Sequence, residues 1–411
     1  MKSQFFDLVA PEEARQRLLA HITPLTETDT LPAYQAMGRV LAHAMRSPQV
    51  LPTFRRSTVD GFAVRAQDTH GASDSLPAYL AMAGEVPMGV ISEQVLQQAQ
   101  AITVHTGGMI PDGADAVVMI EDTQQVGDDE IEVRRTVAAG ENVINVGEDI
   151  NEGDLILPAG HRLREHDIGG LLAVGLTEVE VVARPRVAIF SSGDEVIPPQ
   201  QEPLPGQVRD INSYTLAALV ARMGGQAVLG GILPDDYEAI RARVSAAFKD
   251  GANMIVLSAG SSVSVRDNTA RVLDALGDPG VLVHGIATRP GKPTILGMAG
   301  RVPLIGLPGN PISAFVQFMM IGVPALSALQ GAAPRPAEVL RARLTTNVPS
   351  MAGREDYVPA KLLPGEDIPR AEPIFFKSNL IFKLVEADAL VKIPLDKAGL
   401  QADALVEVRL L

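Results

Sequence analysis

The stretch 306–313, which reads GLPGNPIS, constrains the fold of this chain more than any other. A short apolar run, residues 302–305, precedes it and predicts a buried strand. An apolar segment from Pro311 to Leu329 follows and predicts a helix, with Asn310 as its N-cap and Pro311 in its first position. The N–H groups at the start of such a helix suit an anion, above all phosphate. A capped turn without a ligand is equally consistent with this stretch alone.

The same alternation of apolar runs and amphipathic segments fills residues 184–333. Within it we expect Asn212 to cap one helix and Gly224 to end it. Strands that alternate with helices predict an α/β domain with a mostly parallel sheet, covered by helices on both faces. The expected strands are 187–190, 227–232, 254–257, 281–286, 294–296 and 302–305, and the expected helices are 212–223, 235–249, 268–276 and 311–329.

The rest of the chain has a different pattern. Residues 79–144 contain short apolar runs separated by glycine and proline, which predicts a β-rich region. The tail that follows the small and proline-rich residues 331–336 predicts a small β-barrel or β-sandwich. Helices are expected at 11–22 and 167–175, and a short helix or helix-to-strand element at 33–46.

Composition limits the classes of protein to which the chain can belong. Its 411 residues are too many for one core, so several domains are expected. The net charge of −14 argues against nucleic-acid binding, and a bound anion would need a local basic patch. No apolar run is expected to span a membrane, and the first residues lack a signal-peptide pattern. The absence of cysteine excludes disulfides and fits a cytoplasmic protein.

Four loops are predicted at the carboxyl edge of the parallel sheet, where ligands of such sheets bind. They are residues 191–195, 258–267, 288–293 and 306–313, and together they suit a phosphate ester with a divalent metal. No Walker or dinucleotide-binding glycine motif is present. Asp267 could equally cap a helix. The loops supply small or hydroxyl-bearing residues for close backbone approach (Ser192, Gly193, Gly260, Ser262, Gly309), cations for phosphate (Arg266, Arg289, Lys292) and acids for a metal or a proton (Asp194, Glu195, Asp267).

Three further candidates lie outside the α/β region. Asp60 follows two arginines and two hydroxyl residues in the stretch 55–64, although the local sequence favours a polar loop with an Asp-Gly turn. Thr106 precedes a glycine pair, where backbone N–H groups could hold an anion or simply end a strand. Asp149 lies in an acidic turn, for which a solvated loop is the default interpretation.

Seven motifs, in this order along nearly the whole chain, resemble the molybdopterin molybdenumtransferase family, which includes MoeA and the gephyrin E-domain. The resemblance implies a discontinuous elongated domain (1–49 and 145–183), a β-rich domain (50–144), an α/β domain (184–333) and a C-terminal β-barrel (334–411). It also implies a homodimer. The motifs are STVDGFAV (57–64), HTGGMIPDGADAVV (105–118), GEDI (147–150), PAGHRL (158–163), FSSGDE (190–195), RPGKP (289–293) and GLPGNP (306–311).

The reaction implied by the resemblance is insertion of molybdate into adenylylated molybdopterin, with release of AMP and assistance from Mg²⁺. A MogA-like adenylyltransferase would be a possible partner. By motif match, the catalytic residues are Asp60, Glu195, Asp267 and Lys292, with Glu195 and Asp267 also as Mg²⁺ ligands. The substrate-binding residues are Thr106, Asp149, Ser192, Gly193, Gly260, Ser262, Arg289, Pro308, Gly309 and Asn310.

Three departures from the family pattern keep other functions open. The loop 258–267 has one glycine fewer than usual and gains Arg266, Asn253 replaces a frequent aspartate, and residues 144–146 replace basic ones. A tungstate-directed paralogue fits these changes, as does a non-catalytic scaffold that binds molybdopterin. A weaker alternative is a sugar- or nucleotide-phosphate enzyme with the same fold.

Overall fold

The computed structural model describes residues 8–259, 263–334 and 339–411, and only the backbone of residues 263–267. Contacts divide the chain into two compact units. Unit 1 comprises Met1–His43, Ala159–Arg164 and Glu178–Leu411, and unit 2 comprises Ala44–Pro158 and Glu165–Thr177. The division into four domains remains a prediction.

Unit 1 contains the predicted α/β domain, built on a six-stranded sheet in the order β16-β13-β17-β21-β20-β18. The first four strands are parallel, β20 is antiparallel to β21, and β18 is antiparallel to β20. The expectation of a mostly parallel sheet is therefore confirmed. The strands are β13 (Arg186–Ser192), β16 (Gln226–Leu233), β17 (Met254–Ala259), β18 (Pro279–His284), β20 (Ile295–Ala299) and β21 (Val302–Pro308).

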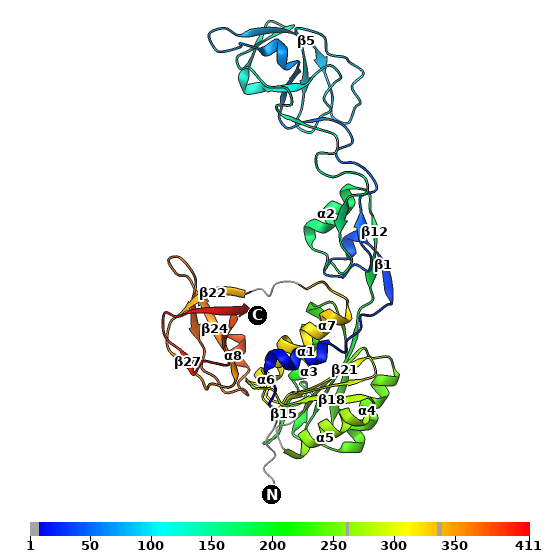
Figure 1. The fold of residues 1–411 in the computed structure, drawn as a ribbon, viewed down its shortest axis with the longest axis vertical. Coiled ribbons are helices and arrows are strands. Elements are labelled where there is room, and N and C mark those ends of the chain that lie inside the picture. The colour runs from blue at the N-terminus through cyan, green and yellow to red at the C-terminus, as the bar shows by residue number, and fades with distance from the viewer. Residues whose placement is uncertain (1–7, 260–262, 335–338) are drawn as a thin grey trace. The chain divides into compact units, whose positions relative to one another are not determined.

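Helices cover both faces of this sheet, as Figure 1 shows. Alternate residues of β13 point into different cores: Val187 and Ile189 into one, Ala188 and Phe190 into the other. Strands buried on both faces need apolar side chains at every position, which explains their continuous apolar runs. The first core contains α1 (Pro11–Leu19), α3 (Asn212–Arg222), α6 (Pro311–Gln317) and α7 (Val323–Leu329), and the second contains α4 (Tyr237–Lys249) and α5 (Val263–Ala275).

The helix predicted at 311–329 is interrupted by a π-helical segment, Phe318–Gly322. Pro324 follows this segment and has no N–H to donate, so the wider turn accommodates a residue that would otherwise break the helix. By length and composition Pro311–Leu329 could span a membrane, which corrects the expectation that no run could do so. However, 67% of its most apolar window is buried, as in a core helix.

Two candidate helix caps differ from the prediction. Asn212 is the first residue of α3 rather than its cap, although Gly224, with a φ of +81°, does follow the helix as expected. α5 begins at Val263 instead of Asn268, so Asp267 lies inside the helix and does not cap it. In α4 the cap is Asp236, whose Oδ1 accepts a hydrogen bond from the Ala239 N–H at 2.8 Å.

The C-terminal part of unit 1 forms the expected β-barrel. Its strands follow the order β24-β25-β22-β28-β26, and pairing of β24 with β26 closes the ring. The strand β19 (Thr288–Arg289) of the α/β domain pairs in parallel with β24, with Arg289 opposite Asp356. The barrel elements are β22 (Val339–Leu344), β23 (Val348–Pro349), β24 (Glu355–Leu363), β25 (Arg370–Pro373), α8 (Phe382–Val385), β26 (Ala389–Ile393), β27 (Gly399–Leu400) and β28 (Leu405–Leu410).

The element predicted at 33–46 is mostly not helical. A 3₁₀ turn, Ala33–Gln35, ends at its cap Ala36, and the short strand β2 (Met45–Arg46) closes the range, so the helix-to-strand alternative is the closer one. The buried residues Val40 and Leu41 instead form β-bridges to other segments. The remaining strands of unit 1 are β1 (Thr28–Pro32), paired with β12 (Glu178–Val182), and β14 (Val196–Ile197), paired with β15 (Val208–Arg209).

Unit 2 is the predicted β-rich region, with a six-stranded sheet in the order β7-β4-β6-β5-β9-β8. Its two cores lie on opposite faces of this sheet, because neighbouring residues such as Phe62 and Ala63 belong to different clusters. Its elements are β2 (Met45–Arg46), β3 (Arg56–Ser57), β4 (Gly61–Val64), a 3₁₀ turn (Ala66–Thr69), β5 (Ala78–Glu85), β6 (Gln100–Val104), β7 (Ala116–Met119), a 3₁₀ turn (Ile120–Asp122), β8 (Thr123–Val126), β9 (Glu130–Val133), β10 (Val143–Ile144), β11 (Leu155–Leu157) and α2 (Glu165–Ala173).

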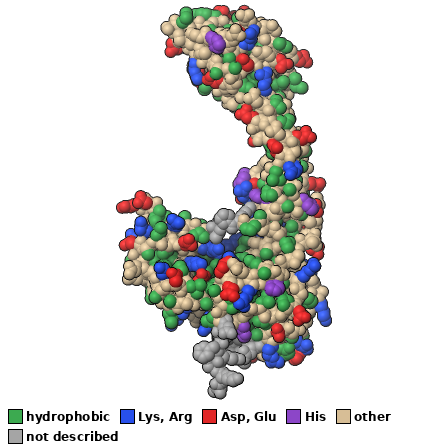
Figure 2. All heavy atoms as spheres, viewed as in Figure 1, with side chains coloured by type: hydrophobic (Ala, Val, Ile, Leu, Met, Phe, Trp, Pro, Cys, Tyr) green, Lys and Arg blue, Asp and Glu red, His purple; other side chains and the backbone are tan. Residues whose placement is uncertain are grey.

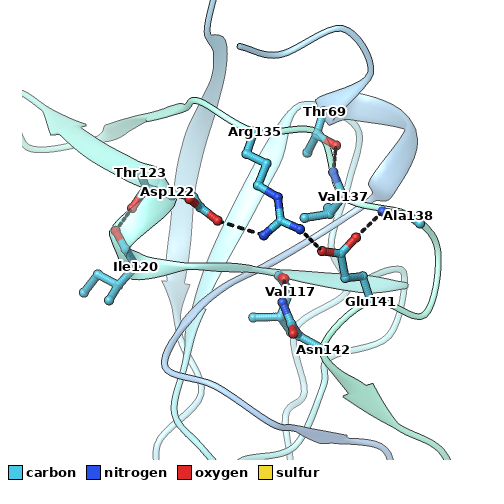
Figure 3. A network of polar contacts seen from close by, with 10 residues as sticks. All are labelled: Thr69, Val117, Ile120, Asp122, Thr123, Arg135, Val137, Ala138, Glu141 and Asn142. Atoms are coloured by element: carbon cyan, nitrogen blue, oxygen red, sulfur yellow. Dashed lines mark hydrogen bonds and ion pairs between the residues drawn. The ribbon is translucent and has the colours of Figure 1, made fainter. Parts of the chain in front are cut away.

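The segment after β9 is held to the sheet by polar contacts (Figure 3). Arg135 lies between Asp122 Oδ2, at 3.2 Å, and Glu141 Oε1, at 2.8 Å. The other oxygen of Glu141 accepts from the Ala138 N–H, and Asn142 donates from Nδ2 to the Val117 carbonyl. These contacts fix the turn that leads from β9 to β10.

Tyr357 of β24 couples the barrel to helix α6, because it packs in a cluster with Ile312 and Val316. Its hydroxyl donates to Glu355 Oε2 at 2.8 Å, and Glu355 is also paired with Lys392. Burial, followed by the negative charge of Glu355, raises the pKa of the Tyr357 phenol far above its ordinary value. Above about pH 10 the unfolded chain therefore loses this proton while the folded chain keeps it, and stability falls as pH rises.

We expect Tyr357→Phe to be less stable than the wild type near pH 8 by about 1 kcal/mol, because a hydrogen bond is lost. Above about pH 10 this difference should shrink by up to about 1.4 kcal/mol per pH unit. Urea unfolding followed by circular dichroism measures both quantities. Tyr214→Phe, at an exposed tyrosine, is the matched control. A difference that stays constant from pH 8 to 11 would contradict the assignment.

Candidate functional site

The carboxyl ends of three parallel strands are aligned at one edge of the unit 1 sheet. Ser192 of β13 lies opposite Ala259 of β17, which lies opposite Pro308 of β21. The antiparallel strand β20 begins at the same edge, with Ile295 opposite Gly306. The loop 288–293 therefore reaches this edge as well, because it connects the end of β18 to the start of β20.

A buried polar network ties this edge to the start of α3. Asn212 donates from Nδ2 both to Ser258 Oγ and to the Gly309 carbonyl, each at 2.8 Å. Ser191 Oγ donates to Asp210 Oδ1 at 2.8 Å, and Asp210 Oδ1 also accepts from the Ser213 N–H. The amide of Asn212 thus bridges two strand ends, which explains why it does not cap its own helix.

The loop 288–293 is held by Gln317 of α6, a residue that the sequence analysis did not select. Gln317 is buried and donates from Nε2 to the Pro290 carbonyl at 2.8 Å. Gly291 has a φ of +115°, and a Cβ atom there would collide with the Gln317 side chain. Glycine at this position is therefore required for the loop to close against the helix.

This loop forms one wall of a cleft of about 610 Å³, and the barrel forms the other. Arg289, Lys292, Pro308 and Asn310, four of the predicted site residues, line the cleft from the α/β side. Among the described residues that line it, every ionisable side chain is a cation. Arg354 and Lys377 of the barrel complete the set with Arg289 and Lys292.

The cleft is thus a local basic patch in a chain of net charge −14. Figure 2 shows a different distribution elsewhere, because acidic and basic side chains are interspersed over the face drawn there. Four convergent cations without a lining acid suit a ligand with several anionic oxygens, such as a phosphate ester or a tetrahedral oxyanion.

A buried carboxylate organises two of these cations. Asp356, in β24, is 1% exposed. Its Oδ1 accepts from Arg354 Nε at 2.9 Å, and its Oδ2 lies 3.6 Å from Arg289 NH1. A buried charge is tolerated only when it is paired, so Asp356 holds both guanidinium groups beside each other despite their mutual repulsion.

The start of helix α6 differs from the prediction. Asn310 occupies the N-cap position, but its side chain makes no capping hydrogen bond and donates from Nδ2 to Ser378 Oγ at 3.0 Å. The Ile312 N–H, one of those expected to face an anion, donates to the Ser378 carbonyl at 3.1 Å. The barrel thus takes up part of the helix terminus.

Ser192, Gly193 and Glu195 lie at the same sheet edge but are not among the described residues that line the cleft. Ser192 Oγ donates to Asp235 Oδ1 at 2.5 Å. Gly193 has a φ of +154°, and a Cβ atom there would lie 2.8 Å from Glu195 Oε2. The exposed Glu195 side chain therefore folds back over a position that only glycine can occupy.

The proposed metal pair is only partly described. Gly260 and Ser262 lie outside the described residues, as does the side chain of Asp267. Among the residues that are described, no three histidine, aspartate or glutamate side chains gather as a metal site would require. Glu195 is the one member of the predicted pair whose side chain is placed, at the end of β13.

In unit 2, Asp60 and Thr106 lie together. Asp60 Oδ1 accepts from the Thr106 N–H at 2.8 Å and is 3.8 Å from His105 Nδ1. The other ring nitrogen of His105 is 2.8 Å from Glu85 Oε1. The backbone N–H of Thr106, expected to be available to an anion, is thus used by Asp60, and His105 and Glu85 are additions to the site.

Asp149 is also in unit 2, in an exposed turn, where its N–H donates to the Leu51 carbonyl at 3.1 Å. No hydrogen bond or ion pair among the described residues of unit 2 joins it to Asp60. The two arginines before Asp60 have structural partners: Arg55 donates to the Ala114 carbonyl, and Arg56 stacks on Phe54. Asp149 therefore remains a predicted site residue that the structure does not bring next to the others.

Family profiles match three segments of the chain. Residues 9–175 match the MoeA N-terminal region (domain I and II), 188–328 a probable molybdopterin-binding domain, and 341–411 the MoeA C-terminal region (domain IV).

Full-length relatives agree with these profiles. A molybdopterin molybdenumtransferase of Nostoc sp. is 33% identical over 92% of this chain and 88% of its own. Molybdopterin molybdenumtransferase 2 of Mycobacterium tuberculosis is 32% identical over 96% and 98%. The crystal structure of a molybdopterin biosynthesis MoeA protein from Pyrococcus horikoshii matches 98% of this chain and 100% of its own, with 32% identity and a TM-score of 0.85. The resemblance drawn from the motifs is confirmed, and the chain belongs to the molybdopterin molybdenumtransferase (MoeA) family.

Proposed function

We propose that this protein is a molybdopterin molybdenumtransferase, which inserts molybdate into molybdopterin. The observation that carries the proposal is the cleft between the α/β domain and the barrel, whose four cations suit both a phosphate ester and a tetrahedral oxyanion. Relatives that cover nearly the whole chain have this name. The cleft cations bind and orient the two anions and neutralise their repulsion, which brings molybdate to the pterin.

In finer detail, the substrate is adenylylated molybdopterin and the second product is AMP. A bound Mg²⁺ would supply charge neutralisation at the phosphate groups. Mg²⁺ takes one or two protein carboxylates and fills its other positions with substrate phosphates and water. The exposed Glu195 carboxylate would be one ligand, and Asp267 is the other candidate. Asp60, whose carboxylate is fixed by the Thr106 N–H, is the candidate for proton handling.

One of the observations that favoured the scaffold alternative, the substitution at Asn253, has a structural explanation. Asn253, which replaces an acid frequent in the family, lies at the amino end of β17, at the edge of the sheet opposite the cleft. Its Oδ1 accepts from the Arg186 N–H at 2.8 Å, a structural role. Preference for tungstate stays an open alternative, because the cleft cations do not distinguish two tetrahedral oxyanions of the same charge. We propose further that the protein is a cytoplasmic homodimer that receives its substrate from a MogA-like adenylyltransferase.

The direct test is turnover. Purified protein, adenylylated molybdopterin, Mg²⁺ and molybdate should yield molybdenum cofactor and AMP, and a parallel assay with tungstate measures the preference between the oxyanions. Asp267→Ala should abolish the reaction, and full activity of this variant would remove Asp267 from the mechanism. If molybdopterin binds but no AMP appears at any oxyanion concentration, the protein is a scaffold. If no pterin binds, the sugar- or nucleotide-phosphate alternative returns.

The role of the cleft can be tested at Lys377, an exposed cation on the barrel side. We expect Lys377→Ala to raise the KM for molybdate at least about tenfold, because a charge-assisted contact of this kind contributes roughly 1.5–3 kcal/mol. Lys397→Ala, at a barrel lysine that does not line the cleft, is the matched control and should leave the KM unchanged. An equal effect of both variants would mean that only the net charge of the barrel matters.

The proposed homodimer predicts complementation between two inactive variants. Asp60→Asn alters unit 2, and Lys292→Gln alters the cleft of unit 1. If each site combines unit 1 of one copy with unit 2 of the other, a mixed dimer contains one intact site. Equal mixing of the two variants after subunit exchange should then restore about a quarter of the wild-type activity. No recovery, despite mixed dimers detected by native mass spectrometry, would show that each site belongs to one chain.

A further inference from the structure

A smaller pocket of about 140 Å³ adjoins the cationic cleft. The two spaces share Arg289 and Phe376, so a ligand that occupies one can extend into the other. The side pocket differs in chemistry from the cleft, because its walls are mainly apolar. Two successive aromatic side chains, Phe375 and Phe376, contribute to them.

Phe375 is 59% exposed and belongs to none of the described core clusters that contain its neighbour. Phe376 packs partly against the barrel core and against the cluster around Tyr357. Single exposed apolar residues are common on protein surfaces. Here, however, the exposed ring lines a pocket that is also lined by the guanidinium group of Arg289. Stacking on an aromatic ring is a usual way to bind a planar heterocycle.

Two charged groups complete the side pocket. Arg289 is about half exposed at the junction with the cleft, and its position is fixed by the ion pair with Asp356. Asp356 also lines the side pocket. A carboxylate has about four acceptor positions, so oxygens already paired with arginine can still accept from a ring amino group. From the cleft into the side pocket, the lining therefore changes from cations, through the guanidinium group of Arg289, to aromatic walls that include a carboxylate acceptor.

We propose that the side pocket binds the planar, amino-bearing nitrogen heterocycle of a phosphate ester whose phosphate lies in the cleft. This inference rests on the proposed function, whose substrate has two such rings, a pterin and an adenine. The phenylalanines supply stacking area, Arg289 links ring and phosphate, and Asp356 accepts from the exocyclic amine. Phe375 then determines selectivity for the ring and contributes nothing to the binding of a bare oxyanion.

The test compares ligands with and without a ring on the full-length protein. Calorimetry gives the Kd of neopterin phosphate, AMP and molybdate for the wild type and for Phe375→Ala. We expect the variant to bind at least one ring-bearing phosphate about tenfold more weakly and molybdate unchanged. Phe375→Trp should restore the affinity, because a tryptophan ring also stacks. The ligand that is weakened identifies which ring the pocket takes, and weakening of both means that it takes either.

Phe382→Ala is the matched control, because Phe382 is another exposed phenylalanine of the barrel and lines neither space. A conservative second variant, Phe376→Leu, tests the other ring without emptying the barrel core. Unchanged affinity of Phe375→Ala for both ring-bearing ligands would overturn the proposal, as would an equal loss of molybdate binding. Failure of the wild type to bind any of the three ligands would instead overturn the proposed function.

Discussion

The ion pairs of Asp356 are the interaction on which the cleft depends. A carboxylate that is 1% exposed needs cationic partners, and its partners come from both walls: Arg289 from β19 and Arg354 from the barrel. The parallel pairing of β19 with β24 sets Arg289 opposite Asp356, so backbone register determines the side-chain contact. The negative charge of Asp356 thereby offsets the repulsion between two neighbouring guanidinium groups, and both of these groups line the cleft.

Two of the residues that order the sheet edge beside the cleft are uncharged. Asn212 bridges Ser258 and Gly309 through neutral hydrogen bonds, and Gln317 holds the loop 288–293 through another. Neutral groups fix these loops without adding negative charge, whereas acids at the same positions would compete with an anionic ligand for the cleft cations. The described ionisable residues that line the cleft are therefore all cations, although the whole chain is strongly acidic.

The fold class and part of the cleft could be predicted from the sequence, because both depend on local pattern. Apolar runs that alternate with helices specified the sheet, and its carboxyl edge specified where Arg289, Lys292 and Pro308 would lie. Arg354, Lys377 and Ser378 could not be predicted, since no periodicity links them to loops far away along the chain. The local preference of asparagine predicts that Asn212 and Asn310 cap helices, whereas their amides bond to tertiary partners at Ser258 and Ser378 instead.

Binding by the cations alone cannot make such a cleft selective. Any phosphate ester, sulfate or tungstate satisfies guanidinium and ammonium groups about as well as the intended ligand, because charge and tetrahedral shape are shared. Discrimination requires contacts that only one ligand completes, and polar or stacking contacts at a ring discriminate more strongly than extra apolar volume. In this structure the groups able to make such contacts, Phe375, Phe376 and the oxygens of Asp356, all border the side pocket. The cations that bind the anion and the groups that select the ring therefore adjoin at Arg289, which lines both spaces. A substrate with an anionic end and a planar ring would contact both sets of groups.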